Sequence, residues 1–569
     1  MEAVEALSDE KSRAGGVRLK EVATAKFSFE ELRTKGFVYV DKTDLLARLA
    51  SDDDAAYFIS RPRRFGKSLM LSTFKCLFEG RRNLFKGLKI EKSGWDWKKK
   101  FPVILLDMQE YRAETVDGLR DNLFSCAEKI AAQFGLDVKT EASAGMYLNS
   151  VLRALAAKRG QFVVLVDEYD VPLQGFLGKS DEIAKARTLL HDFYVQFKSR
   201  SEDIRFLMIT GVSKFTKVSL FSGLNTPSDL TMNYGDYAGL LGYTHEEFVR
   251  YFGEHVRALA SKRGWTEDET REKIYSWYDS YRFSPYSETR VLNPVSVGQL
   301  FKTGNFDSYW VSTAMSTLVY ERMLAAEKTP FELDGIAATP LELDVCDAES
   351  LPYKALLYQT GYLTIKSAST DKDLRTRLVL GIPNREVRTA LEEGWIGDMM
   401  HLDVPNTESL VASGRRQLAA GDIANLVNET LYTLFAQVPA QWKISCEADA
   451  KRHFLLFAEM LGAKPRPEVV TARGYADAII ETPKAVYVFE FKYNRSAAAA
   501  LRQIRDKGYA DAYRADKRPV TLVGINFNSR SRNVQEPKIE SFGVTQTRRV
   551  RIIQRKTLST KSSKRRKTK

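Results

Sequence analysis

A glycine, a lysine and a serine stand together after the apolar run 57–60. They are Gly66, Lys67 and Ser68. Phosphate binding uses backbone N–H groups at a helix N-terminus, a lysine that reaches the β and γ phosphates, and a hydroxyl that binds Mg²⁺. We therefore expect these three residues to bind ATP, with Ser68 also on Mg²⁺. In the full GxxxxGK[ST] pattern a further glycine would stand at position 61, where this chain has Arg61.

Two adjacent carboxylates, Asp167 and Glu168, follow the apolar run 162–166. At the end of such a strand in a P-loop ATPase, the aspartate holds Mg²⁺ through water and the next glutamate can polarise the attacking water. We expect Asp167 to bind the metal and the nucleotide, and Glu168 to be catalytic. The alternative is that both carboxylates only solvate a strand end. We also expect Arg64 to contact phosphate, although a charged loop edge explains it almost as well.

A second group of chemical residues lies near the C-terminus, where two strand-like runs carry Asp477 and Glu490-Phe491-Lys492. Alternation along a strand sends Glu490 and Lys492 to one face and Phe491 to the other. Asp477 and Glu490 could hold a Mg²⁺ ion that activates water and stabilises a pentavalent phosphate, while Lys492 positions the water or offsets charge. This is the PD-(D/E)xK arrangement of metal-dependent nucleases. A surface salt bridge is the alternative.

Three further polar residues are candidates for the same site. Gln503, on the helix predicted after the second strand, matches the glutamine that many such nucleases place beside the site. Glu447 and Glu468 are two alternatives for an acidic residue on or after the preceding helix. Nothing in the pattern indicates base-reading specificity, because such a site grips backbone phosphate.

The elements that must position these residues follow from the apolar pattern. Near-continuous apolar strands joined by long connections predict a parallel sheet buried on both faces, the doubly wound α/β fold. A helical, aromatic-rich stretch at 244–310 predicts a lid or bundle whose aromatic side chains form its core. In the C-terminal region, strands at 468–471, 476–480, 485–491 and 520–526 surround a helix at 497–511. The N-terminal strands are expected at 57–60, 101–108, 162–166 and 204–211.

The motifs resemble the AAA-ATPase-like family that is often fused to a PD-(D/E)xK nuclease domain. The resemblance rests on RPRRFGKS at 61–68, VDEYD at 166–170, TGVSKFTKVSLFSGLN at 210–225, YDSYRF at 278–283, LNPVS at 292–296, YW at 309–310, YQTGY at 358–362 and GIPN at 381–384. It covers about residues 21–530 and implies that the missing first glycine is a family trait.

The resemblance and the patterns together predict the organisation of the chain. We expect an α/β protein in which a P-loop NTPase sheet with a helical lid precedes a small α/β restriction-endonuclease-like domain. The predicted segments are a flexible leader (1–20), the P-loop domain (21–243), the lid (244–340), a mixed helical connector (341–445), the nuclease-like domain (446–546) and a disordered basic tail (547–569).

Composition bounds the class of protein. The chain has 569 residues, of which 44% are hydrophobic and 28% charged, as in ordinary globular proteins of several domains. No run approaches the roughly 20 apolar residues that span a bilayer, and the acidic N-terminus lacks a signal-peptide block. We expect an intracellular protein that does not enter the membrane. The four cysteines are scattered, which argues against a disulfide framework and a structural zinc site.

Much of the net charge of +13 belongs to the C-terminal tail. Residues 548–569 hold eleven Lys or Arg and no acid, and subtracting them from +13 leaves +2 for the rest. Such a segment cannot bury enough apolar surface to fold alone. It would suit a nuclear-import address in a eukaryotic cell, a non-specific phosphate-binding arm, or a solubilising end without a partner.

The residues therefore predict an ATP-binding protein coupled to a Mg²⁺-dependent nuclease domain that acts on nucleic acid, with DNA favoured over RNA. The sequence leaves the oligomeric state open, and a homo-oligomer would agree with the rings that many P-loop relatives form. The alternative is an NTP-dependent switch or an effector whose C-terminal domain binds nucleic acid or protein without cutting.

Overall fold

The structure is a computed structural model that describes residues 19–24, 28–52, 56–176, 179–214, 227–310, 316–326, 328–344, 352–400, 404–438, 444–463 and 465–542. The predicted basic tail and all but the last two residues of the predicted leader lie outside these ranges, as does most of the stretch 210–225. The chain forms two compact units, Met1–Leu391 and Glu392–Lys569.

The first unit is built on a parallel five-stranded sheet in the order β2-β3-β4-β1-β5. The predicted doubly wound sheet is confirmed, and its first four strands follow the predicted apolar runs closely. Because β4 lies between β1 and β3, the carboxyl ends of these three strands meet at one edge of the sheet. The strands are β1 (Ala56–Ser60), β2 (Val103–Asp107), β3 (Phe162–Asp167), β4 (Ile204–Gly211) and β5 (Ser228–Asp229).

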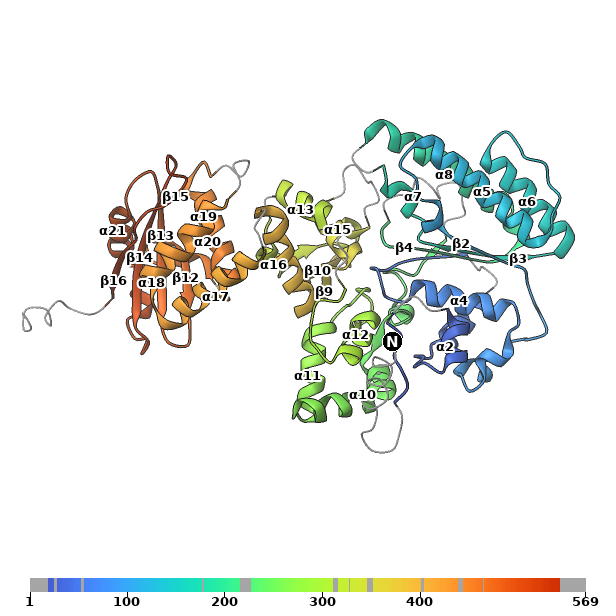
Figure 1. Ribbon diagram of the computed structural model, residues 1–569, viewed down its shortest axis with the longest axis horizontal. Coiled ribbons are helices and arrows are strands. Elements are labelled where there is room, and N and C mark those ends of the chain that lie inside the picture. Colours follow the sequence, from blue (N-terminus) through green and yellow to red (C-terminus); the bar gives the residue numbers. More distant parts are fainter. Residues whose placement is uncertain are drawn as a thin grey trace, which may run out of the picture. The chain divides into compact units, whose positions relative to one another are not determined.

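Helices cover both faces of this sheet (Figure 1). On one face, buried side chains of the strands pack into one core with α5 (Val116–Phe134), α6 (Ala144–Arg159) and α8 (Ser180–Ser199). On the other face lies α4 (Lys67–Phe78), whose Phe74 ring is 4.8 Å from that of Phe206 on β4. Continuous apolar strands thus lie between two helical layers, which is what buries a parallel sheet.

The helices predicted over 244–310 are present, and their aromatic residues form a core of their own that includes Phe248, Phe252 and Tyr278. A three-stranded antiparallel sheet in the order β8-β10-β9 follows them. The bounds in this part of the unit are α10 (His245–Arg263), α11 (Glu267–Tyr278), α12 (Pro294–Thr303), α13 (Ser316–Ala325), β8 (Ile336–Ala338), α14 (Pro340–Leu343), α15 (Tyr353–Thr360), β9 (Thr364–Thr370) and β10 (Thr376–Gly381).

The second unit contains a mixed sheet in the order β11-β12-β13-β14-β15, with β16 also on β14. Only the β13–β14 pair is parallel among its described pairs. On one face, α21 (Ala497–Lys507) packs on Val486 and Val488, and on the other Phe454 of α20 (Glu447–Met460) contacts Phe489. The strands are β11 (Pro465–Thr471), β12 (Gly474–Glu481), β13 (Val486–Tyr493), β14 (Val520–Asn528), β15 (Asn533–Val534) and β16 (Lys538–Ser541).

Gly361 allows a close approach between α15 and the loop after β1. Its φ is 91°, and a Cβ atom there would lie 2.7 Å from Cγ of Pro62. We predict that Gly361→Ala lowers the free energy of unfolding by about 2 kcal/mol or more, because it adds a left-handed residue to an overpacked contact. Gly253→Ala is the matched control, since its Cβ would meet nothing within 4 Å. Urea denaturation measures both, and equal stabilities of the two variants would contradict the prediction.

Candidate functional site

The loop after β1 leads into the N-terminus of α4, which is a favourable position for an anion. Gly66 is the N-cap of α4 with φ 96° and, having no side chain, provides no cap for the first N–H groups of the helix. Arg64 shares the left-handed region, with φ 67°. Unpaired N–H groups and the helix dipole favour a negative ligand at this point.

Lys67 is buried beside this helix start. Its Nζ donates to the carbonyl oxygens of Arg61 at 2.9 Å and Pro62 at 3.1 Å. Burial lowers the pKa of Lys67, while the nearby carboxylates of Glu168 and Asp167 act in the opposite direction. The lysine therefore lies where the loop would wrap a phosphate, with its charge only partly compensated by protein.

The structure brings Ser68 and Asp167 together, as the sequence predicts. Ser68 Oγ donates to Asp167 Oδ2 at 2.5 Å, and Thr210 Oγ1 on β4 donates to Asp167 Oδ1 at 2.7 Å. A hydroxyl and a carboxylate at this spacing are the oxygen donors that Mg²⁺ prefers. Thr210 was missed from the sequence, although its place at the end of a predicted strand was a usable signal.

Glu168 follows Asp167 with a left-handed φ of 52°. Its carboxylate accepts a hydrogen bond from Nε2 of Gln109, which lies in the 3-10 turn Met108–Tyr111 after β2. Burial raises the pKa of Glu168, and Lys67 opposes that shift. Gln109 was also missed, because a lone glutamine after a strand has no distinguishing pattern.

Two arginines of this loop lie in different surroundings, since Arg61 is buried and Arg64 is exposed. Arg61, at the position of the absent glycine, is buried and donates from Nη1 to the carbonyl oxygens of Ser60 and Thr231, each at 2.9 Å. Its guanidinium stacks over the Phe283 ring at 4.4 Å. The Arg61 side chain thus holds the loop after β1 against Thr231 and Phe283. Arg64, predicted to bind nucleotide, is exposed and donates to the Tyr309 carbonyl at 2.8 Å.

In the second unit, Asp477 and Glu490 lie on neighbouring strands. The β12–β13 ladder pairs Ala478 with Phe489 as its last described pair, so Asp477 and Glu490 occupy the next position and the same face. Beyond that pair, Asp477 Oδ2 accepts from the Phe491 N–H at 2.8 Å. The side chain of Asp477 therefore bonds the β13 backbone just past the end of the ladder.

Lys492 completes the group that the sequence predicted. Its Nζ donates to Glu490 Oε1 at 3.1 Å and to Glu447 Oε1 at 3.0 Å. Of the two alternative acids, Glu447 thus contacts this group directly, whereas Glu468 accepts from Lys451 at 2.9 Å, and Lys451 in turn lies 3.7 Å from Asp477.

The carboxylates of this group are poorly compensated. Burial, and then the neighbouring Asp477, raise the pKa of Glu490 to about 7, and burial also raises the pKa of Asp477. Burial disfavours the charged form of Lys492, but Glu447 and Glu490 more than offset this and raise its pKa. Within the described residues, Glu490 Oε2 is buried without a hydrogen-bond partner. An orphaned buried oxygen beside a second carboxylate fits a divalent cation.

Gln503, predicted to belong to this site, is on α21, and its Nε2 donates to the Tyr509 hydroxyl at 3.3 Å. No hydrogen bond among the described residues joins it to Asp477, Glu490 or Lys492. Asn526, which sequence reasoning missed, is the register partner of Lys492 in the parallel β13–β14 pair and is 1% exposed. Its amide oxygen accepts from the Arg495 N–H at 2.9 Å.

Known proteins match both units. Residues 25–221 match the family described as "Predicted AAA-ATPase", and residues 446–537 match the PD-(D/E)XK nuclease superfamily. The chain is also 32% identical over 525 residues to the "Uncharacterized protein in vnfD 5'region" of Azotobacter chroococcum mcd 1, covering 89% of this chain and 96% of that protein. The chain belongs to the AAA-ATPase-like family with a C-terminal PD-(D/E)XK domain. The predicted family and fold class are thereby confirmed.

No helix in the described ranges is long and apolar enough to cross a membrane. Likewise, no group of three or more His, Cys, Asp or Glu side chains arranged to hold a metal is found among the residues that the structure describes.

Glu386 is a buried carboxyl group that is connected through Trp310 to the loop after β1. It is fully buried and accepts from Trp310 N at 2.7 Å, while Trp310 Nε1 donates to the Arg63 carbonyl at 3.0 Å. Burial raises the pKa of Glu386 from 4.5 to about 7. A carboxyl group with a raised pKa stabilises the fold below the unfolded pKa, and this contribution is lost as the pH rises through the folded pKa.

We therefore predict that the wild-type chain loses up to about 3 kcal/mol of unfolding free energy, relative to Glu386→Gln, between pH 4.5 and pH 7. Above that window the difference stays constant. Urea denaturation of the two proteins across this range measures it, with the exposed Glu321→Gln as control. Parallel stability curves for wild type and Glu386→Gln would show the prediction to be wrong.

Proposed function

We propose that this protein binds ATP in its first unit and cuts nucleic-acid phosphodiester bonds, in DNA foremost, with a divalent metal in its second unit. The observation that carries the proposal is the buried group of Asp477, Glu490 and Lys492, in which Glu490 Oε2 has no partner in the described structure. The family assignment of both units supports it.

In the first unit, we assign the phosphates of ATP to the helix start at Gly66 and to Lys67. Entry of a phosphate would let Lys67 Nζ exchange its bonds to the Arg61 and Pro62 carbonyls for charged oxygens. Charge-assisted bonds are about twice as strong as neutral ones, which favours this exchange. Ser68 and Asp167 would hold Mg²⁺, and Glu168 would orient the attacking water.

In the second unit, Asp477 and Glu490 would hold Mg²⁺ or a similar ion. The ion supplies Lewis-acid stabilisation of the phosphate and a nucleophile at neutral pH. Lys492 lies on the face of Glu490 and places a positive charge beside the carboxylates, where it can contact a phosphate oxygen or orient water. With raised pKa values, Asp477 and Glu490 gain most from a cation, since it removes their mutual repulsion.

The nuclease proposal predicts that Glu490→Gln and Lys492→Ala each lower the rate of plasmid cleavage roughly 100-fold or more, because the first removes a ligand of the proposed cation and the second removes a positive charge beside the phosphate. Purified chain is incubated with circular DNA and Mg²⁺ or Mn²⁺, and nicked and linear products are quantified on gels. Glu540→Gln is the control, since Glu540 is exposed on β16 and pairs with Arg505 rather than with a residue of this group.

Cleavage that persists in EDTA, or that is equal in Glu490→Gln and wild type, would contradict a metal-dependent site. If no phosphodiesterase activity appears with either metal while the protein binds DNA, the C-terminal unit acts as a binding module and the chain as an NTP-dependent switch.

The nucleotide proposal predicts that Lys67→Ala weakens ATP binding at least about tenfold, through the loss of a charged hydrogen-bond donor to phosphate. Fluorescence titration with a labelled ATP analogue measures the affinity. Lys75→Ala, in the last turn of the same helix, is the matched control and should keep wild-type affinity. Equal affinities for the two variants would remove Lys67 from the nucleotide site.

A further inference from the structure

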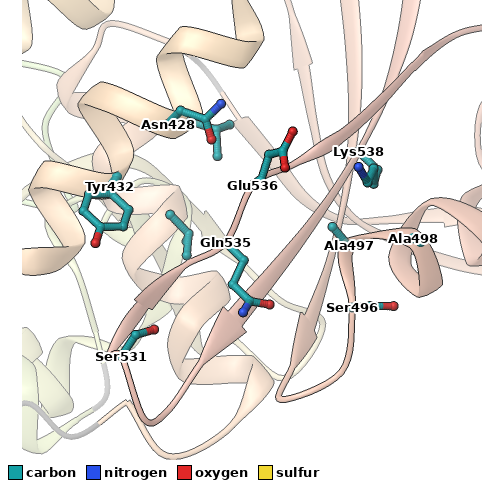
Figure 2. A pocket seen from close by; sticks show the side chains of 11 residues that line it. Asn428, Tyr432, Ser496, Ala497, Ala498, Ser531, Gln535, Glu536 and Lys538 are labelled. Carbon is teal, nitrogen blue, oxygen red and sulfur yellow. The ribbon is translucent and has the colours of Figure 1, made fainter.

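An open pocket of about 690 Å³ lies in the second unit beside β15 and the start of α21. Figure 2 shows its polar lining, in which Asn428 and Glu536 face each other and Lys538 and Ser496 stand opposite Tyr432. The volume falls within the range of small-ligand sites, roughly 300–1,000 Å³. Neither the proposed ATP site nor the carboxylate group uses these residues.

One wall of the pocket is a π-helical turn, Leu426–Leu431, between α18 (Ile423–Asn425) and α19 (Tyr432–Ala436). Such turns are rare and occur frequently at functional sites. Leu426, Val427 and Leu431 are buried, whereas Asn428 is exposed and Tyr432 is 48% exposed. Asn428 of the turn and Tyr432, the first residue of α19, therefore present an amide and an aromatic ring to the pocket, which Val427 also lines.

Asn526 connects this pocket to the carboxylate group. Asn526 is the register partner of Lys492, and its Nδ2 donates to Oε1 of the pocket residue Gln535 at 2.7 Å. Its backbone carbonyl also accepts from Gln535 N at 2.8 Å. On the other side, Asn526 holds the N–H of Arg495, which immediately precedes Ser496 in the lining. One buried amide thus fixes two walls of the pocket against the strand that carries Glu490 and Lys492.

We propose that this pocket binds a nucleobase of the strand whose phosphodiester bond lies at Glu490 and Lys492, with the Tyr432 ring as the stacking surface. The inference rests on the proposed nuclease function and deepens it by naming a substrate contact. Aromatic rings stack on bases of any kind, and the amides of Asn428 and Gln535 offer donors and acceptors to a base edge. Arg495 and Arg530, exposed after β13 and β14, place positive charge at the same edge of the sheet for the backbone.

A base held in such a pocket must be unpaired, so the contact favours single-stranded or frayed DNA over intact duplex. The test uses single-stranded DNA oligonucleotides that carry one 2-aminopurine at successive positions. They are titrated with full-length Glu490→Gln protein in Ca²⁺. Because the ring accepts any base, we expect a fluorescence change with 2-aminopurine at every internal position, with binding weakened roughly tenfold by Tyr432→Ala and retained by Tyr432→Phe. Asn428→Ala, a second exposed variant, should weaken binding without affecting the fold.

The outcome separates this inference from the nuclease proposal. If wild type cuts DNA but Tyr432→Ala has the same affinity, the same fluorescence pattern and an unchanged KM, the pocket does not hold a base and the inference fails alone. If wild type cuts nothing while the fluorescence signal persists and is lost in Tyr432→Ala, the base pocket stands and the nuclease proposal fails. A signal that Tyr432→Ala leaves intact overturns the inference.

Discussion

The cost of burying charge is the constraint on which both candidate sites depend. An isolated ion inside a protein is strongly unfavourable unless it is paired and hydrogen-bonded. In the first unit, hydrogen bonds offset this cost. Lys67 donates to carbonyl oxygens of its own loop, and Asp167 accepts from Ser68 and Thr210. In the second unit the pairing is incomplete, because Lys492 contacts one oxygen of Glu490 and the other oxygen stays unpaired within the described structure. The unpaired oxygen of Glu490 therefore marks the position where a bound cation would stabilise the protein most.

Strand direction explains why the chemical residues converge. In the first unit, parallel pairing brings the carboxyl ends of β1, β3 and β4 to one edge, and the loop, Asp167 and Thr210 all lie there. In the second unit, the parallel β13–β14 pair places Asn526 beside Lys492, while the antiparallel β12 delivers Asp477 to the same end. The first site therefore stands at strand ends, whereas the second lies past the end of the β12–β13 ladder, with Glu490 and Lys492 still paired with β14.

Much of this arrangement could be predicted from sequence, because apolar runs and motif spacing are local signals. The strand bearing Asp167 and the alternation that puts Glu490 and Lys492 on one face belong to that class. Contacts between distant segments could not be predicted. Gln109 reaches Glu168 only because β2 and β3 are neighbours, and the burial of Arg61 depends on Thr231 and Phe283 far along the chain. The π-helical turn has no characteristic pattern of apolar residues in the sequence. The pocket beside it could therefore not be predicted from the sequence.

The central claim is that Asp477 and Glu490 form a cation-binding centre for phosphodiester chemistry. It is tested most directly by anomalous diffraction from nucleotide-free crystals soaked in Mn²⁺, compared between wild type and Glu490→Gln. The account predicts a manganese peak in contact with Glu490 Oε2 and the Asp477 carboxylate in wild type, and its loss in the variant. A wild-type map without a peak at these two carboxylates, at a Mn²⁺ concentration that saturates other sites, would contradict it.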